Sequence, residues 1–451
     1  MKIDPSKVNR TIRILIESGE AAGIEEAEAI LRRYKLQILV TREAAQHECW
    51  QAAALTGVNA ATRAMLGGVD VQIEQDAVAN TPWAAGELLS HAIIALGGSV
   101  VDELDPDFPT LVIGAPEPQQ RPAAGSPAIH ICASGWRAGV RPVPLPIPGP
   151  APSVTAAVTA AGIGVSEAFQ RLRGSKVAGS REVGLSLWDP GRDWRTADRT
   201  EPVAPYLPAA AWLIGLGHLG QAYAWHIGCL PYGDHSEISL YLQDDDAICE
   251  ANRGTSLLLA GQADGTRKAR LVAERLDALG FTTHIIERKF GPDLRVQPGE
   301  PKLALVGLDN PSARRPLSGA GFDLVVDAGL GATPADFTDM SIHELPGPRT
   351  SDEIWRRNTE TMTIDDAHPT YDAIATQTDD RCGVQLMLGT SVATAFVGVV
   401  AAGLGIAAAL RHIHDQPPVP FVSYSLRSID PPQADVDTGH PAARIASVPA
   451  R

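Results

Sequence analysis

The sequence predicts a mixed α/β protein with two halves, each built on a mainly parallel β-sheet. Short apolar runs typical of buried strands alternate with helical segments, which is the pattern of a parallel sheet covered by helices on both faces. A glycine-rich turn joins one of these strands to the next helix, and the order of elements in the first half returns in the second. A chain of 451 residues has room for two or three domains at roughly 150 residues each.

The second half has the clearer order of elements. Ala211–Gln221 is typical of a strand that enters a glycine-rich turn, and a helix continues from the turn to about Gly228. Further strands and helices follow along the chain, and a long uncharged helix closes the series. We expect strands at Ile238–Leu242, Thr282–Ile286, Leu303–Val306 and Leu324–Asp327, and helices at Gly265–Leu279 and Thr390–Leu410.

The first half resembles a copy of the second half without its glycines. Leu96–Pro118 runs parallel to Leu279–Pro311, and the uncharged helix Ser153–Gly164 ends this half. Its first strand, Leu36–Val40, is followed by Thr41-Arg-Glu-Ala-Ala instead of a glycine turn. Because a backbone without those glycines cannot approach a pyrophosphate closely, we predict one nucleotide-binding and one non-binding half. Chance similarity between two α/β halves is the alternative.

Composition changes along the chain suggest four segments. We place a first domain at residues 1–178, a linker at 179–208, a second domain at 209–415 and a tail at 416–451. The linker is rich in Arg, Asp, Trp and Pro and has no periodicity. The tail is rich in proline, with one expected strand at Phe421–Leu426, and we expect about its last fifteen residues to be mobile.

Charge and cysteine usage exclude several classes of protein. The net charge of −15 argues against a nucleic-acid reader that relies on a general basic field. Five scattered cysteines without a CxxC pair indicate neither a disulfide framework nor a zinc site, which fits a reducing cytoplasm. The N-terminus has no secretory pattern. The uncharged stretch Gly383–Leu410 is long enough to span a bilayer, but its small residues favour a buried helix, so we expect no membrane span.

The chemistry of the second half starts at the glycine turn. Gly215, Gly217 and Gly220 form a GxGxxG at a junction of strand and helix, where a helix N-terminus can face a phosphate. This motif alone fits NAD, FAD, S-adenosylmethionine or ATP, or a tight turn with no ligand. Asp244 and Asp246 lie just past the second strand, where a carboxylate commonly binds ribose hydroxyls. A hydrated acidic loop is the alternative for them.

Polar residues further along favour ATP over NAD. Asn252 and Arg253 follow the acids, Lys268 stands at the start of a helix, and Asp309 ends a strand. An enzyme that directs an attack on an α-phosphate needs cations around the triphosphate and a carboxylate for magnesium. Asp309 lies where such a magnesium ligand should lie, although each of these residues taken alone is more often a solvated surface residue.

These motifs resemble the ThiF/MoeB superfamily of adenylating enzymes, which includes the ubiquitin-activating enzymes. The resemblance covers about Ala211–Leu410 and rests on the glycine turn, Asp244/Asp246 with Asn252, Gly265–Lys268 and Leu308-Asp309-Asn310. It implies two Rossmann-like adenylation-type halves, an inactive N-terminal one and an active C-terminal one. By the resemblance Asp244 would bind ribose, Asn252, Arg253 and Lys268 would bind the phosphates, and Asp309 would bind Mg²⁺. The sequence departs from the family pattern at Ala251–Ser256. The position of the family's arginine is occupied by Thr255, and Arg253 comes two positions earlier, so the pattern leaves open which arginine contacts the phosphates.

Two further residues, Arg10 and Cys382, resemble features of the ubiquitin-type activating enzymes in particular. Val8–Leu15 looks like the opening helix of their inactive halves, whose arginine reaches into the ATP site of the partner half; Arg10 is the candidate, with an ordinary surface arginine as the alternative. Cys382 precedes the closing helix, where helix amides and Arg381 would lower the pKa of a thiol. Its position is similar to the catalytic cysteine of the autophagy-type enzyme, and 343–382 resembles a crossover loop.

The resemblance implies activation of a ubiquitin-like protein with ATP and Mg²⁺. The C-terminal carboxylate of the partner would be adenylated, captured by Cys382 as a thioester and passed to a conjugating enzyme. Two fused halves with this cysteine look most like the activating enzymes of bacterial antiphage conjugation operons. Three alternatives remain, namely an adenylyltransferase without a thioester step, an NAD-dependent oxidoreductase and an inactive scaffold. The internal repeat could satisfy two-fold pairing within one chain, and a symmetric homodimer is the other arrangement.

Overall fold

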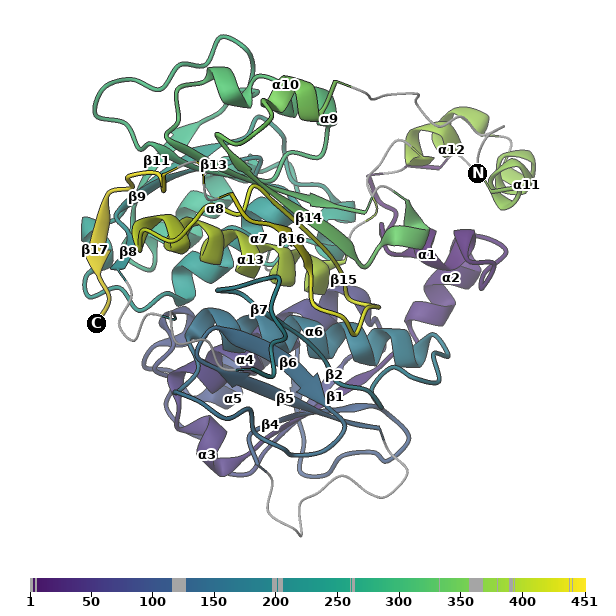
Figure 1. Ribbon diagram of the computed structural model, residues 1–451. Coiled ribbons are helices and arrows are strands. Elements are labelled where there is room, and N and C mark those ends of the chain that lie inside the picture. The colour runs from purple at the N-terminus through teal and green to yellow at the C-terminus, as the bar shows by residue number, and fades with distance from the viewer. Residues whose placement is uncertain are drawn as a thin grey trace.

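The architecture is described from a computed structural model of the chain. The description covers residues 3–451 with the exception of 5, 116–126, 197–200, 202–205, 260, 262–263, 332, 357–367, 379, 389–391, 393, 438 and 440. Two large sheets lie at opposite sides of a central layer of helices (Figure 1). The expected mixed α/β architecture with two mainly parallel sheets is therefore confirmed.

The first sheet has seven strands in the order β3-β2-β1-β4-β5-β6-β7. Strand β1 lies between β2 and β4 with parallel register, and pairs Leu36 with Val69 and Val40 with Ile113. Strands β6 and β7 are antiparallel to their neighbours. The strands are β1 (Leu36–Val40), β2 (Val69–Ile73), β3 (Ser99–Val100), β4 (Thr110–Ile113), β5 (Ala128–Ser134), β6 (Arg137–Arg141) and β7 (Val183–Ser186).

The second sheet repeats this order and adds one strand. Its eight strands follow the order β11-β10-β9-β12-β13-β14-β15-β16, in which β14, β15 and β16 are antiparallel. The expected internal repeat is therefore present in the topology, since β3 and β4 correspond to β11 and β12. The strands are β9 (Ala210–Ile214), β10 (Ser239–Gln243), β11 (Thr282–Ile286), β12 (Leu303–Val306), β13 (Leu324–Leu330), β14 (Asp339–Leu345), β15 (Phe421–Ser425) and β16 (Gln433–Asp435).

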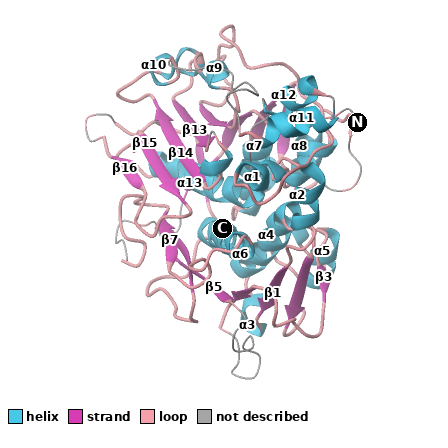
Figure 2. Cartoon of the chain, turned by 90° about the vertical axis from the view of Figure 1, so that its right-hand side faces the viewer, coloured by secondary structure: helices cyan, strands magenta, loops and turns pink. Residues whose placement is uncertain are grey.

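Four long helices fill the space between the sheets (Figure 2). They are α4 (Glu48–Ala64) and α6 (Val154–Leu172) from the first half, and α7 (His218–Cys229) and α13 (Ala395–Ile413) from the second. Small residues let them approach closely, because a Cβ atom on Gly162 of α6 would come within 3.0 Å of the Phe396 carbonyl oxygen of α13. The two halves therefore share one continuous hydrophobic core.

Helix α13 is the long apolar helix for which the sequence left a choice between a membrane span and a buried core helix. It is the one helix of the described part of the chain that is long and apolar enough to cross a bilayer, and 94% of its apolar window is buried inside the protein. It packs on α6 and α7 of the central layer. The composition argument for a buried core helix is confirmed.

Shorter helices surround this frame. Near the N-terminus, α1 and α2 lie beside α11 and α12, which project from one side of the molecule (Figure 1). The shorter helices are α1 (Ile12–Glu17), α2 (Ile24–Leu31), α3 (Arg42–Ala45), α5 (Leu89–Ala95), α8 (Lys268–Asp277), α9 (Pro311–Arg314), α10 (Ser351–Ile354), α11 (Thr370–Thr378) and α12 (Arg381–Leu388).

The structure corrects the expected linker and tail. Within 179–208, β7 is a strand of the first sheet, and the segment without periodicity is held by buried tryptophans, with Trp194 packed against Gly139 and Gly184. In the tail, the expected strand is present as β15. The end expected to be mobile contains β17 (Ser447–Pro449), which pairs with β8 (Tyr206–Pro208).

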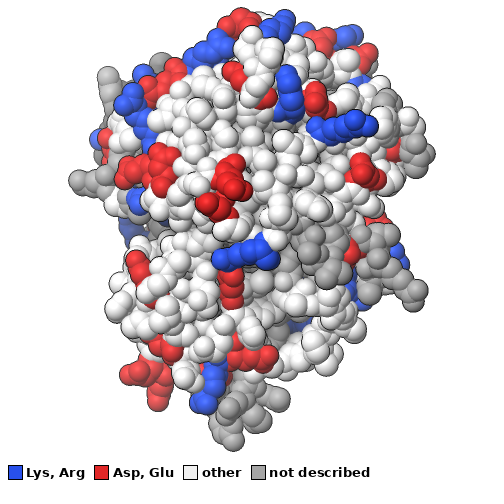
Figure 3. All heavy atoms as spheres, turned by 90° about the vertical axis from the view of Figure 1, so that its left-hand side faces the viewer, with Lys and Arg blue, Asp and Glu red and all other residues white. Residues whose placement is uncertain are grey.

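Two boundaries near the expected crossover loop also differ. Residues 343–345 belong to β14, and α10 and α11 make the described part of 343–382 more regular than expected. The closing helix begins at Ala395 with Thr394 as its N-cap, and Cys382 belongs to a separate helix, α12. On the face in Figure 3, acidic and basic side chains are interspersed over a mostly uncharged surface.

Candidate functional site

The glycine turn combines two packed glycines with one open one. Gly215 follows β9 with a φ of +80°, and a Cβ atom there would lie 2.9 Å from the Gly307 carbonyl oxygen. A Cβ atom on Gly220 would collide with the carbonyl oxygen of Gly215. Gly217 is the N-cap of α7, and a Cβ atom there would meet nothing within 4 Å. The helix N-terminus therefore has open space beside it, as a phosphate site requires.

Asp244 fixes the turn from the end of β10. One of its carboxylate oxygens accepts a hydrogen bond from the Leu216 amide at 2.6 Å, and the other accepts from the Asp246 amide at 2.8 Å. Burial raises the pKa of Asp244, opposed by the charge of Lys268 and by these two amides. Asp244, Asp245 and Asp246 offer carboxylate oxygens within 4.8 Å of one another.

Lys268 and Asp246 form the ion pair of the site. Lys268 is the first residue of α8, and its ammonium lies 2.7 Å from a carboxylate oxygen of Asp246. Burial works to raise the pKa of Asp246, but Lys268, Lys289 and Arg10 together hold it below its ordinary value. Lys289 lies beyond β11 and was not found by the sequence analysis, although basic residues after a strand next to β10 are a usable signal.

Arg10, in the N-terminal segment of the first half, acts on this group through its charge. Its charge lowers the pKa of Asp246 and contributes to lowering that of His218, which burial brings to about 4. His218 is the first residue of α7, inside the glycine turn, and it packs against Gly398 of α13. The arginine thus lies near the nucleotide-type turn of the other half, and its catalytic role stays a prediction.

Asn252 and Arg253 lie on a short 3₁₀ segment, η4 (Glu250–Gly254). The Asn252 side-chain oxygen accepts a hydrogen bond from the Cys249 amide at 2.9 Å, so it shapes the turn itself. The Arg253 guanidinium donates to the Gly261 carbonyl at 2.6 Å and lies 3.4 Å from Asp264. The Arg253 guanidinium is therefore engaged by the segment that follows η4, and Thr255, the other candidate position, is buried.

Asp309 is held at the carboxyl end of β12 by an arginine that the sequence analysis missed. Asp309 is exposed, and the carbonyl of the preceding Leu308 accepts a hydrogen bond from the Arg314 Nε at 3.0 Å. Arg314 also lies 3.0 Å from Asp327, a fully buried carboxylate of β13. Burial raises the pKa of Asp327 to about 7, opposed by Arg314. The pair fixes the loop that carries Asp309.

Cys382 is the second residue of α12, and its side chain lies outside the described part of the structure. The expectation that it directly precedes the closing helix is wrong, because α12 ends at Leu388 and α13 starts at Ala395. Cys382 does lie near a helix N-terminus, as expected, but this helix is α12. The N-terminal segment contacts this region, since the Ile3 amide donates to Asp380 at 2.6 Å.

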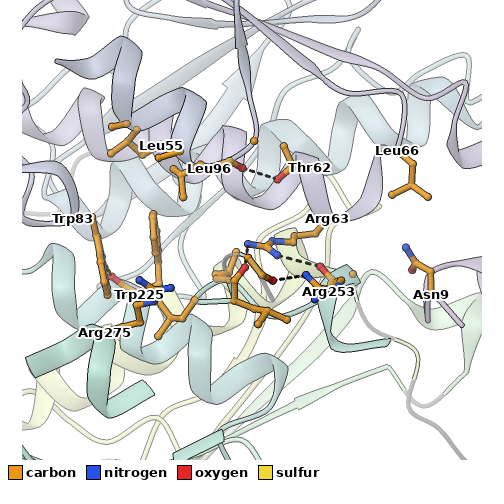
Figure 4. Close-up of a pocket in the computed structure, with 18 of the residues that line it drawn as sticks. Asn9, Leu55, Thr62, Arg63, Leu66, Trp83, Leu96, Trp225, Arg253 and Arg275 are labelled. Atoms are coloured by element: carbon orange, nitrogen blue, oxygen red, sulfur yellow. Dashed lines mark hydrogen bonds between the residues drawn. The ribbon is translucent and has the colours of Figure 1, made fainter. Parts of the chain in front are cut away.

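A cavity of about 510 Å³ lies between the two halves, and Arg253 and Gly254 of η4 form part of its lining (Figure 4). Its walls carry the stacked rings of Trp83 and Trp225, with centroids 4.9 Å apart, and several leucines. Arg63 and Arg253 point into its middle (Figure 4). Neither the glycine turn nor the aspartates line it, so this cavity is not the predicted nucleotide site.

Fold and site together define an α/β protein with two Rossmann-like halves, one of which carries the glycine turn and its acidic and basic partners. Residues 35–187 match the family model of the BilD N-terminal domain, and residues 207–416 match that of the BilD C-terminal domain. The chain is 38% identical over 435 residues to the "Bacterial E1-like protein BilD" of Collimonas sp. (strain OK412), a match that covers 95% of this chain and 93% of the relative. The chain belongs to the BilD family.

Solved structures of E. coli MccB are also similar. The complex with selenomethionine MccA has a TM-score of 0.35 at 16% identity, and the match covers 53% of this chain and 67% of that one. The complex with ATP has a TM-score of 0.30 at 13% identity, covering 52% and 64%. The family assignment confirms the expected relation to E1-like proteins, while the closer likeness to the autophagy-type enzyme stays a prediction.

Proposed function

We propose that this protein activates the C-terminus of a ubiquitin-like protein in the bacterial cytoplasm by adenylation with MgATP. The main support is the Asp246–Lys268 ion pair beside the open N-terminus of α7, and the charge of Arg10 from the other half also acts on Asp246. Membership of a family with E1-like relatives agrees with this reading and disfavours an NAD-dependent oxidoreductase. A dehydrogenase would not need Lys268.

In this proposal the side chains position and neutralise and form no covalent bond in the first step. Asp244 holds ribose hydroxyls, the open space at Gly217 admits the phosphates, and Lys268 and Arg10 neutralise their charge. Asp309 fits as a magnesium ligand because exposed carboxylate oxygens suit that ion, which would offset charge on the phosphate oxygens. Asn252 and Arg253 support this site indirectly, by shaping η4.

The first step forms a bond between a carboxylate oxygen of the partner and the α-phosphorus of ATP. The bond from that phosphorus to the bridging oxygen breaks, and pyrophosphate leaves. In the second step the Cys382 thiolate attacks the acyl carbon and AMP leaves, which gives a thioester for transfer to a conjugating enzyme. An adenylyltransferase without this second step is the alternative. Only the enzyme with the second step requires Cys382, so a Cys382 variant distinguishes the two.

ATP–pyrophosphate exchange with a candidate ubiquitin-like protein from a neighbouring gene tests the first step. Asp309→Ala should abolish exchange, whereas Asp323→Ala should not, because Asp323 is an equally exposed aspartate at the opposite, amino end of β13. Cys382→Ala should keep exchange and lose the thioester seen with wild type. Full product formation by Cys382→Ala would support the alternative, and no exchange with any partner would indicate an inactive scaffold.

A further inference from the structure

The backbone after η4 is held by side chains of the other half. Asn59 of α4 donates a hydrogen bond from its amide nitrogen to the Leu257 carbonyl at 2.9 Å. Arg63, one turn further along α4, donates to the Leu259 carbonyl at 2.8 Å and to the Arg253 carbonyl at 3.3 Å. Three carbonyls of 253–259 therefore find their donors on a helix of the non-binding half.

Asn59 and Arg63 also support each other. The Asn59 side-chain oxygen accepts from the Arg63 Nε at 3.3 Å and from a terminal nitrogen at 3.0 Å. Asn59 is fully buried, and burial followed by the charge of Arg253 lowers the pKa of Arg63 to about 10, so it stays charged at neutral pH. Figure 4 shows Arg63 extending from α4 toward the chain at Arg253.

The same segment is tied to the glycine turn. Gln221 of α7 accepts a hydrogen bond from the Leu258 amide at 3.0 Å and donates to the Leu216 carbonyl at 3.2 Å. The Leu216 amide in turn donates to Asp244. An unbroken series of hydrogen bonds and peptide units thus runs from Arg63 and Asn59 to the carboxylate expected to bind ribose.

The N-terminal segment closes the opposite side of η4. The Ser6 carbonyl accepts a hydrogen bond from the Ala251 amide at 2.6 Å. A Cβ atom on Gly254 would lie 2.7 Å from the side-chain oxygen of Asn9, so the two chains are in close contact there. With Asn59 and Arg63 on one side and Ser6 and Asn9 on the other, η4 is enclosed by residues of the first half.

We propose that Asn59 and Arg63 are positioning residues for the nucleotide site, which act by holding the segment 253–259 against the glycine turn. The inference rests on the proposed function and assigns a task to the half that lacks the glycines. Without these donors, one buried carbonyl and two part-buried carbonyls lose their partners, and the segment is free to shift. Because the segment is joined to Leu216 and Asp244, its displacement should weaken nucleotide binding.

Binding of MgATP by isothermal titration calorimetry tests this with matched variants. Asn59→Ala and Arg63→Met each remove the donors, and Arg63→Met keeps an apolar stem. Gln51→Ala is the control, because Gln51 is also fully buried on α4 and makes three hydrogen bonds, to Ala45, Val78 and Asn80, all within the first half. Melting temperatures and hydrogen–deuterium exchange of peptides that cover 250–259 are measured beside the titrations.

We expect Asn59→Ala and Arg63→Met to raise the Kd for MgATP at least about tenfold, which equals ~1.4 kcal/mol. Exchange in 250–259 should rise, and Gln51→Ala should lower the melting temperature without either effect. If Asn59→Ala and Arg63→Met both bind MgATP like wild type, the inference is wrong while the proposed function stands. If wild type itself does not bind MgATP, both are overturned.

Discussion

At the scale of single residues, the three glycines of the turn perform different tasks. Gly215 and Gly220 pack against backbone, whereas Gly217 faces open space. A methyl group on Gly220 would collide with the Gly215 carbonyl, so Gly220→Ala should lower stability by about 1–3 kcal/mol, as overpacking does. Gly217→Ala should keep the melting temperature of wild type but weaken MgATP binding. Equal loss of stability in the two variants would contradict this division of tasks.

Asp327 should make stability depend on pH. Its pKa is about 7 in the folded protein, against 3.8 for the ordinary side chain, so the folded state holds this proton more tightly. The stabilisation is therefore complete below about pH 4 and is lost as the pH rises to about 7. Relative to Asp327→Asn, wild type should lose on the order of 4 kcal/mol across this window. Urea unfolding at several pH values measures it, and parallel curves for the two proteins would rule it out.

At the scale of elements, buried parallel strands were the most predictable part of the fold. Leu36–Val40 and Leu303–Val306 were predicted with the observed bounds, since such strands appear as short apolar runs between breaks. The bounds of Thr282–Ile286, an edge strand that is largely exposed, were also predicted. Strand β6 was missed because Arg137 and Arg141 interrupt the apolar pattern. Arg137 is fully buried, and the partners that make this tolerable, Glu201 at 3.5 Å and the Pro148 carbonyl at 2.9 Å, become visible only in three dimensions.

The candidate site divides in the same way. The glycine turn and the helix start at Lys268 have local signals, namely glycines next to a strand and a cation at a helix N-terminus. Asn59 has none, because the carbonyl that it contacts is 198 positions away in the chain. The Arg314–Asp327 pair has only the weak signal of a polar residue inside an apolar strand. The residues assigned to the ligand thus have local sequence signals, whereas the residues that hold them in place have weak signals or none.

At the scale of the whole molecule, the N-terminal segment joins the two regions on which the proposed reaction depends. Ser6 and Asn9 contact η4, and Arg10 lies near Asp246. A few residues later, Arg13 donates to the Leu388 carbonyl at the end of α12 at 3.2 Å and to the Tyr371 hydroxyl of α11 at 3.2 Å. A single short stretch therefore touches both the nucleotide-type site and the helix that carries Cys382.

Removing Arg13 should loosen α11 and α12 while it leaves the glycine turn in place. Arg13 is 4% exposed, and its hydrogen bonds to Tyr371, Met387 and Leu388 link α1 to α11 and α12, so Arg13→Ala would delete these links. Hydrogen–deuterium exchange should rise in 370–388 and not in 211–221, and thioester formation should fall more than ATP–pyrophosphate exchange. Arg32→Ala is the control, because Arg32 is exposed and pairs only locally with Glu28 at 2.9 Å. Equal losses in both half-reactions would mean that the segment supports the whole fold and not α12 in particular.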